Sequence, residues 1–396
     1  MFRIRPAQIV LSAILLLISN FAVALAQHDA SGGGTTSGAA TGGGGGSHVV
    51  IKSTPKSPAT TVKKRTSVAR KPAPPRGTTA DYYVRQGDVS FDAKNYDDAM
   101  ESYQKAVQMN PSMAHAQYRM GWIHNEWEEY SEAIAPLKEA TRLDPNHSSA
   151  FAELGFAYLK MEENTEALAA YRQAARIKPD YALAHYEIGW LSNDLKDYNE
   201  AVRSLQRALK YKPEYPLAHN ELGYAYEKLG RYQDAIVEYK EAIKGNPDLA
   251  LAHFGLADLY YYDTKQYVEA AAEYKRGLSI NPDKASASHN LGWCYNELGR
   301  YTDALTALRE AVRVKPDYAE AHYEMGYANQ QLSRFAEAVA EYKTAIRQKS
   351  EYAVAHYQLG LTYLSMRNRP LAVEQQRILQ RIDPDRANKL LNQINK

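Results

Sequence analysis

The sequence predicts an all-α protein: a superhelix, or solenoid, of about nine helix-turn-helix repeats, preceded by a signal peptide and a disordered linker. Three observations lead to this prediction. Prolines recur at steps of 34 residues through most of the 396-residue chain. Small and apolar residues recur at fixed positions between them, whereas residues 27–79 show no such period. Self-similarity of this length is typical of stacked repeats, because each unit buries its apolar face only against its neighbours.

A series of prolines sets the repeat length. They are Pro111, Pro145, Pro179, Pro213 and Pro247 at steps of 34, then Pro282 after 35 and Pro316 after 34. Ser350 takes the next equivalent position, and Pro384 resumes the series. The repeats accordingly begin at Ala80, Ala114, Ser148, Ala182, Pro216, Ala250, Ala285, Ala319 and Ala353. Because proline cannot continue a helix, each repeat is expected to end its second helix just before the proline.

Two packed helices are predicted inside each repeat. In the third repeat, Phe151, Leu154, Gly155 and Tyr158 fall on one helix face. The eighth position is glycine in every repeat but the sixth, which has Ala257; the glycines are Gly87, Gly121, Gly155, Gly189, Gly223, Gly292, Gly326 and Gly360. Glycine in a helix costs about 1 kcal/mol relative to alanine, so its recurrence predicts a neighbouring helix too close for a side chain. The second helix supplies a matching small surface, at Ala99, Ala133, Ala167, Ala201, Ala235, Ala270, Ala304, Ala338 and Ala372.

Three repeats depart from the pattern. The sixth has one extra residue, which we place in the inter-helix turn at 262–266. Pro136 lies inside the second helix of repeat two and should bend or shorten it. The ninth has Gln376 and Leu379 where a large apolar residue and alanine are expected. With residues 387–394 it is similar to a terminal cap, whose polar outer face stops a solenoid from continuing.

A 34-residue helix-turn-helix with an apolar-Gly pair, a downstream Ala-x-x-x-aromatic and a terminal Pro resembles the tetratricopeptide repeat (TPR). The resemblance covers residues 80–386, and residues 387–396 remain as a C-terminal capping segment. It implies a right-handed superhelix whose first helices line a concave groove that binds protein or peptide segments. The Lys/Arg clamp with which some members hold a C-terminal carboxylate is not matched.

The resemblance also implies which positions line the groove: the fifth, ninth and twelfth of each repeat. The expected partner-binding residues are Tyr118, Trp122, Asn125, Tyr186, Trp190, Asn193, Asn220, Tyr224, Phe254, Trp293, Asn296, Tyr323 and Tyr327. Gly-Trp-x-x-Asn occurs three times among them, which places an amide able to bind a peptide backbone beside an aromatic ring. The alternative is that these aromatics pack between repeats. Acids recur at the sixth position, so a basic or apolar partner is expected; they are Glu153, Glu187, Glu221 and Glu324.

The N-terminus, residues 1–26, resembles an export signal. Arg3 and Arg5 precede an apolar stretch that ends in Ala24-Leu25-Ala26, and small residues there suit cleavage before Gln27. The alternative is an uncleaved membrane anchor, since about 18 apolar residues lie at the lower limit for crossing a bilayer. The protein is therefore expected to be periplasmic or secreted, or anchored in a membrane if the segment is retained.

Residues 27–79 form the predicted linker. A Gly/Ser/Thr-rich part is followed by a proline-rich part with eight Lys or Arg, a composition that cannot support a packed core. From Asp81 onward there are 38 basic and 45 acidic residues, a net charge of −7. The basic linker could contact an anionic surface or its own acidic groove. Specific nucleic-acid binding is disfavoured because no aromatics interleave with the basic residues.

Catalytic and metal chemistry are not predicted. The chain shows no nucleophile with a positioned base, no P-loop and no His-x-x-x-His pair, so no catalytic residue, metal or cofactor is assigned. Histidines recur at the fourth position of several repeats, too far apart to share one zinc ion. The single cysteine, Cys294, is expected to be a buried small apolar side chain. Three functions remain. The preferred one is an exported adaptor that binds peptides, for example in envelope assembly or secretion. The second is an anchored structural spacer, and the least favoured is an enzyme.

Overall fold

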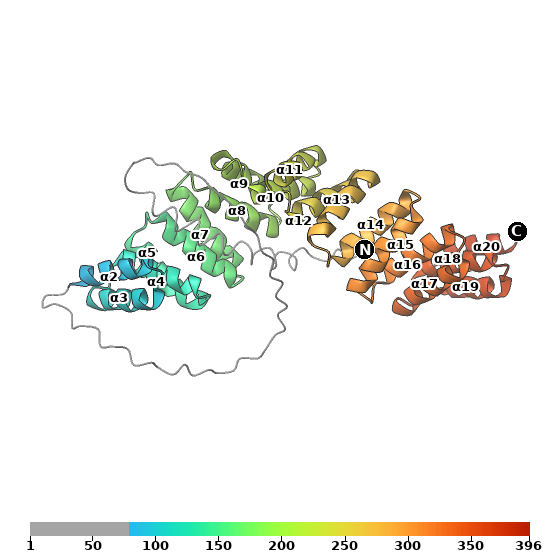
Figure 1. Cartoon of the computed structure of the whole chain (residues 1–396), viewed down its shortest axis with the longest axis horizontal. Helices are drawn as coiled ribbons and strands as arrows, with labels where there is room; N and C mark the ends of the chain where they lie inside the picture. Colours follow the sequence, from blue (N-terminus) through green and yellow to red (C-terminus); the bar gives the residue numbers. More distant parts are fainter. Residues whose placement is uncertain (1–78) are drawn as a thin grey trace, which may run out of the picture. The chain divides into compact units, whose positions relative to one another are not determined.

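The computed structural model describes residues 79–396, which form helices joined by short turns (Figure 1). First and second helices alternate as predicted. The first helices are α2 (Ala80–Asp92), α4 (Ala114–Glu126), α6 (Ser148–Lys160), α8 (Ala182–Asp194), α10 (Pro216–Lys228), α12 (Ala250–Asp258, continued by the π-helix η1, Leu259–Asp263), α14 (Ala285–Glu297), α16 (Ala319–Gln331) and α18 (Ala353–Ser365). The second helices are α3 (Tyr96–Met109), α5 (Tyr130–Leu143), α7 (Asn164–Ile177), α9 (Tyr198–Tyr211), α11 (Tyr232–Gly245), α13 (Tyr267–Ile280), α15 (Tyr301–Val314), α17 (Phe335–Gln348) and α19 (Arg369–Ile382). The predicted all-α stack of nine helix pairs is confirmed for this part of the chain.

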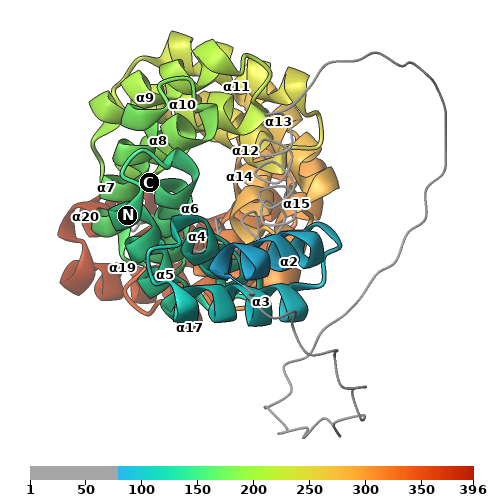
Figure 2. The ribbon, with the colours of Figure 1, turned by 90° about the vertical axis from the view of Figure 1, so that its left-hand side faces the viewer.

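The chain divides into two compact units, and the division falls inside α7 between Ala170 and Tyr171. In the N-terminal unit, the pairs α2/α3 and α4/α5 pack side by side and are followed by α6. In the C-terminal unit, the remaining pairs follow one another around a turn (Figure 2). There α8, α10, α12 and α14 lie on the inner side of the turn, and α9, α11, α13 and α15 on its outer side.

Each helix pair closes over the glycine at the eighth position. A β-carbon built on Gly121 would lie 2.4 Å from Cγ of Leu137 on α5, and one on Gly292 would lie 2.5 Å from Cγ of Leu308 on α15. In other repeats a tyrosine ring takes the place of the leucine. The nine predicted small residues of the second helices are all 0% exposed. The prediction that glycine and alanine mark a close helix contact is confirmed, because no larger side chain fits there.

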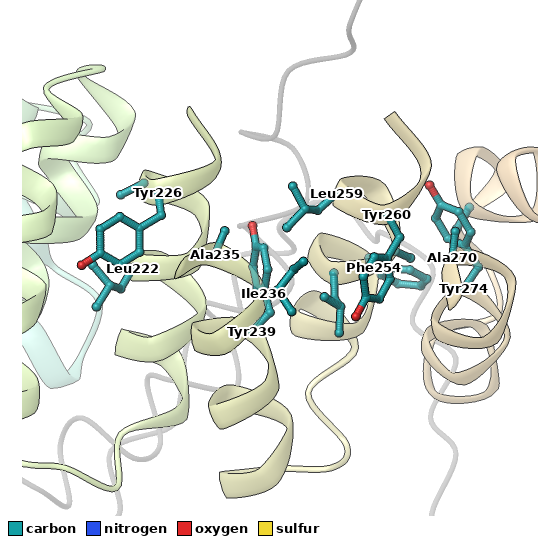
Figure 3. Close-up of a cluster of buried hydrophobic side chains, with 14 of the residues drawn as sticks. Leu222, Tyr226, Ala235, Ile236, Tyr239, Phe254, Leu259, Tyr260, Ala270 and Tyr274 are labelled. Atoms are coloured by element: carbon teal, nitrogen blue, oxygen red, sulfur yellow. The ribbon is translucent and has the colours of Figure 1, made fainter. Parts of the chain in front are cut away.

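Large rings fill the space that these small residues leave. Tyr103, Tyr171, Tyr239, Tyr274 and Tyr342 are among the largest fully buried side chains, and each stands on a second helix. Figure 3 shows Tyr239 and Tyr274 in one continuous apolar cluster of the C-terminal unit. Burying an aromatic ring contributes about 2–3 kcal/mol, so these rings hold each pair together.

The turn inside each pair has one residue in the left-handed backbone region. In the fifth and seventh repeats it is Gly230 and Gly299, with φ of +74° and +70°. The other repeats use a non-glycine residue there: Lys94, Glu128, Glu162, Lys196, Lys265, Ser333 and Arg367. This residue ends the first helix and reverses the chain within three residues.

Two of the expected departures need correction. The extra residue of repeat six does not lengthen its turn: Thr264, Lys265 and Gln266 separate the two helices, as three residues do elsewhere. It is taken up as the π-helix η1, because one wider helical turn inserts a residue without disturbing the packed pair. Pro136 does not shorten α5, which has the same 14 residues as the other second helices.

A last helix, α20 (Pro384–Ile394), follows the ninth pair. It begins three residues before the boundary placed at 387. A β-carbon on Gly360 of α18 would lie 2.5 Å from Cδ2 of Leu390, so α20 covers the glycine that a second helix covers in earlier repeats. The predicted signal peptide and residues 27–78 of the linker lie outside the described residues. Within residues 79–396, no helix combines the length and apolar character needed to cross a bilayer.

Candidate functional site

The ninth position of the first helices carries an aromatic series whose exposure differs between the two units. In the C-terminal unit, Trp190, Tyr224, Trp293 and Tyr327 are half-buried. In the N-terminal unit, Trp122 is only 6% exposed, because it packs between the rings of Phe91 and Tyr96 with centroids 4.7 and 5.5 Å away. The predicted groove role of Trp122 is therefore corrected: its ring belongs to the contact between repeats.

An edge-on tyrosine holds most of these rings. Tyr198 and Tyr301, each the first residue of a second helix, lie 6.3 Å from Tyr224 and Tyr327 of the following repeat, in both cases with planes at 75°. The Trp293 ring contacts Tyr267 and Tyr261 at 5.1 and 4.7 Å. The sequence assigned the ninth-position rings to the groove. The structure packs Tyr224, Trp293 and Tyr327 against these tyrosines, so each of the three rings has one packed edge and one remaining surface.

Aromatics at the fifth position pack against the start of the next repeat. The ring of Tyr186 lies 4.9 Å from that of Tyr215, and the ring of Tyr323 lies 5.5 Å from that of Tyr352. Tyr118, Tyr186 and Phe254 are buried, and Tyr323 is half-buried. The first three therefore act as packing residues in this structure, because neighbouring side chains enclose their rings.

The asparagines of Gly-Trp-x-x-Asn link neighbouring repeats. Asn125 donates from Nδ2 to the side-chain Oε2 of Glu153 at 2.7 Å and to its backbone oxygen at 3.1 Å. The same pair of bonds joins Asn193 to Glu221, at 3.0 and 3.0 Å. It recurs between Asn296 and Glu324, at 2.8 and 3.2 Å. We call this arrangement, with its partners 28 residues apart, the Asn–Glu clamp.

The clamp corrects two predictions. The amides of Asn125, Asn193 and Asn296 are buried and committed to the next repeat, so they do not offer a hydrogen bond to a peptide backbone. Asn220, also buried, donates to the carboxylate of the adjacent Glu221 at 3.2 Å. Its predicted partner-binding role is corrected for the same reason.

The acids of the clamp do not form the open acidic surface that was expected. Burial raises the pKa of Glu221, and it raises the pKa of Glu324 to about 7 despite the hydrogen bond from Asn296. A carboxyl with that pKa is partly protonated at neutral pH because desolvation penalises its charged form. Sequence spacing placed these residues correctly on the first helix, but it could not show that the asparagine of the preceding repeat bonds to them.

Models of known protein families match this repeat. A family model described as "TPR repeat" matches residues 193–230, 228–263, 294–333 and 331–366, and one described as "Tetratricopeptide repeat" matches residues 273–306. The chain belongs to the tetratricopeptide-repeat family. Residues 74–189 match a model described as the C-terminal ARM domain of tetratricopeptide repeat protein 21. TPR-family proteins are typically protein-binding modules without catalytic activity.

Several solved structures share similarity with parts of the chain. YrrB, described as a TPR protein with an unusual peptide-binding site, is 22% identical with a TM-score of 0.45, covering 48% of this chain and all of its own. MamA is 24% identical with a TM-score of 0.40, covering 43% and 93%. PilF of Pseudomonas aeruginosa is 20% identical with a TM-score of 0.46, covering 56% and 97%. No curated protein matches the chain.

TPR repeats five and six carry two acids at positions where the repeats on either side have an aromatic or an amide. Asp258 stands at the ninth position and accepts a hydrogen bond from the Tyr274 hydroxyl at 2.6 Å. Glu227 stands at the twelfth, accepts from the Tyr239 hydroxyl at 3.2 Å and pairs with Lys228. Burial raises the pKa of both carboxyls. Both acids stand at positions expected to line the groove, but neither was among the predicted partner-binding residues.

The fourth-position histidines of the TPR repeats bond within their own repeats. Nδ1 of His219 lies 2.7 Å from Glu238, and Nδ1 of His322 lies 2.6 Å from Glu341 on the following second helix. Among residues 79–396, no group of three His, Cys, Asp or Glu side chains is arranged to hold a metal ion. Cys294 is buried, as expected, and burial raises its thiol pKa to about 12.

Proposed function

We propose that this TPR protein is an exported interaction scaffold that binds peptide segments of partner proteins along the first helices of its C-terminal unit. One observation carries the proposal: Trp190, Tyr224, Trp293 and Tyr327 stay half-exposed at the ninth position, while the recurring glycines and alanines of the repeat pattern are buried. Their helices α8, α10 and α14 lie on the inner side of that unit (Figure 2). Large rings of this kind supply most of the binding energy at protein interfaces.

The packing behind these rings favours binding. Tyr224, Trp293 and Tyr327 are each fixed edge-on by a tyrosine of the preceding repeat, and the Asn–Glu clamp joins the first helices that carry them. A ring that is already ordered loses little conformational freedom when a ligand arrives. The aromatic series is therefore a preorganised apolar track.

The partner that suits this track is apolar or basic. The chain from Asp81 onward has a net charge of −7, and Glu227 and Asp258 stand on the first helices between the half-exposed rings. A partner cation near these carboxylates would lower their pKa and so gain from their ionisation. Acidic peptides would be disfavoured by the same charges.

Selection from a phage-displayed library of random 15-residue peptides tests the proposal, followed by calorimetric titration of one enriched peptide. We expect the substitutions Trp190→Ala and Tyr224→Ala each to weaken binding by at least tenfold, the effect of losing about 1.4 kcal/mol at an interface hot spot. Val237→Ala and Val268→Ala are matched controls, because both side chains are exposed on second helices, and they should leave affinity unchanged.

Two outcomes would decide against the proposal. Equal affinity of the wild type and the two aromatic variants would show that the first helices do not bind the peptide. Failure to enrich any peptide would favour the alternative function, a structural spacer. Export is tested separately by N-terminal sequencing of the full chain from a secreting host, where cleavage before Gln27 is expected.

A further inference from the structure

TPR repeat four lacks the acid that the other fourth-position histidines use. Nineteen or twenty residues after His219, His253 and His322 the second helix provides Glu238, Glu273 and Glu341, each within 2.7 Å of the histidine Nδ1. His356 bonds to Gln375 in the same way. In repeat four the equivalent residue is Ser204, whose hydroxyl donates to Glu200 in its own helix.

His185 is therefore left with an unused nitrogen. Its Nε2 lies 2.9 Å from the carbonyl oxygen of Pro179, so the ring proton resides on Nε2 and Nδ1 carries a lone pair. Nδ1 is buried and has no hydrogen-bond partner in the described part of the chain, and the whole residue is only 5% exposed. Burial and the neighbouring Arg207 lower the pKa of this imidazole, which keeps it neutral. A buried acceptor without a donor is energetically unfavourable, because it has lost its hydrogen bond to water.

A cavity of about 240 Å³ opens beside this ring. It is lined by Ala175, Pro179, His185, Arg207, Lys210 and Tyr211. The Tyr211 ring lies nearly parallel to the imidazole, with an angle of 15° and centroids 6.1 Å apart. The volume is several times the roughly 30 Å³ that one water occupies in the liquid. The space therefore suits a small polar group.

The charges of this cavity are positive. Arg207 and Lys210 are exposed, and neither forms an ion pair within residues 79–396. Repeat five, by contrast, replaces Arg207 with Glu241, which pairs with Lys244 at 2.8 Å. Lys210 also lies in the last turn of α9, where a cation offsets the helix dipole, so the position of the charges alone does not define a ligand. The unpartnered Nδ1 adds a second requirement: besides a negative charge, the ligand must have a group that donates a hydrogen bond to Nδ1.

We infer that this cavity binds a phosphate group, whose charged oxygens accept hydrogen bonds from Arg207 and Lys210 while its P–OH donates to Nδ1 of His185. Arginine and lysine are the side chains that recognise phosphate oxygens in proteins. A phosphate that keeps one proton supplies both the negative charge and the donor. A carboxylate or sulfate at neutral pH supplies only the charge. The site is separate from the proposed aromatic track and does not depend on it.

Proton-linked binding follows from this geometry. The groups that face the imidazole are Arg207, Lys210 and Tyr211 of α9, while the α7 side contributes Ala175 and the loop contributes Pro179. No carboxylate is among them. A phosphate monoester loses its last P–OH proton near pH 6, so its affinity should fall as pH rises beyond that value. Inorganic phosphate keeps one P–OH in this range and should lose less affinity.

Nuclear magnetic resonance of the full chain with ¹⁵N-labelled histidine tests the inference. Inorganic phosphate should shift the Nδ1 resonance of His185 saturably, while sulfate at equal ionic strength should bind at least tenfold more weakly. O-phosphoserine is the second probe, compared at pH 5.5, where most of the monoester still carries its P–OH. A tighter complex with it than with inorganic phosphate at that pH identifies a phosphorylated side chain as the source of the group. Weaker binding of O-phosphoserine identifies free phosphate as the source.

Variants separate the site from general charge effects. Arg207→Gln and Lys210→Gln alter exposed residues and should each weaken phosphate at least tenfold. Arg203→Gln is the matched control, because Arg203 lies on the same helix, pairs with Glu200 and does not line the cavity. Ser204→Glu restores the acid of the other repeats and should abolish binding by occupying Nδ1. Equal binding of phosphate and sulfate, or equal loss in Arg203→Gln and Arg207→Gln, would overturn the inference.

Discussion

Glu324 offers the sharpest test of the Asn–Glu clamp, because its carboxyl is buried and titrates near neutrality. Burial raises its pKa from 4.5 to about 7, with the nearby Glu297 acting in the same direction. Below pH 4.5 the group is protonated in both the folded and unfolded states. Between pH 4.5 and about 7 it ionises on unfolding but not in the fold, so stability falls as pH rises. At about 1.4 kcal/mol per pH unit, the loss amounts to about 3 kcal/mol and is constant above pH 7.

The substitution Glu324→Gln should remove this pH dependence, since an amide oxygen can still accept from Asn296 but carries no charge. Amide hydrogen exchange of α16 measures the local opening free energy, which suits a repeat protein whose ends need not unfold together. We expect the variant to match the wild type near pH 4 and to exceed it by about 3 kcal/mol at pH 8. A difference between the two that stays flat from pH 4 to pH 8 would refute the argument. Glu297→Gln, an exposed neighbour, should give only a small change.

Three further predictions concern the repeat framework. Gly292→Ala should cost about 1–3 kcal/mol, because its methyl would lie 2.5 Å from a leucine, whereas Gly230→Ala, strained only by its φ of +74°, should cost about 1 kcal/mol. Urea unfolding measures both, and a neutral Gly292→Ala would contradict the close contact. The pKa of His219 is raised by its bond to Glu238, which gives stability at low pH that is lost as pH rises through that pKa. Glu238→Gln should lower the pKa of His219 in an NMR titration, and an unchanged pKa would show that Glu238 does not pair with His219. Asn125→Ala removes two hydrogen bonds to a buried acid and should cost about 1–3 kcal/mol in a thermal melt, so a loss below about 0.5 kcal/mol would argue against the clamp.

The framework of this protein could be predicted because it is local and repeated. Proline at each repeat end, glycine at the eighth position and alanine on the second helix are required wherever two short helices pack closely. Those demands recur at the same spacing, so the sequence records them nine times. Helix order, helix ends and the buried small residues followed from this pattern alone.

The candidate site could be predicted only in part. The first-helix positions of Trp190, Tyr224, Trp293 and Tyr327 were found from spacing, and these rings remain half-exposed. Trp122 shares the same motif yet is buried, because Phe91 and Tyr96 happen to cover it. A motif within one repeat does not specify what the neighbouring repeat places over it.

The sequence by itself determined the helix pairs, their order and the residues that hold most pairs together, because those contacts join residues 16 positions apart within one repeat. Only the tertiary structure decided which side chains face outward. The Asn–Glu clamp spans 28 residues between repeats, and the unpaired nitrogen of His185 arises from a serine on the next helix. Burial and hydrogen bonding depend on such neighbours, and they fix whether an amide, an acid or an imidazole is available for binding.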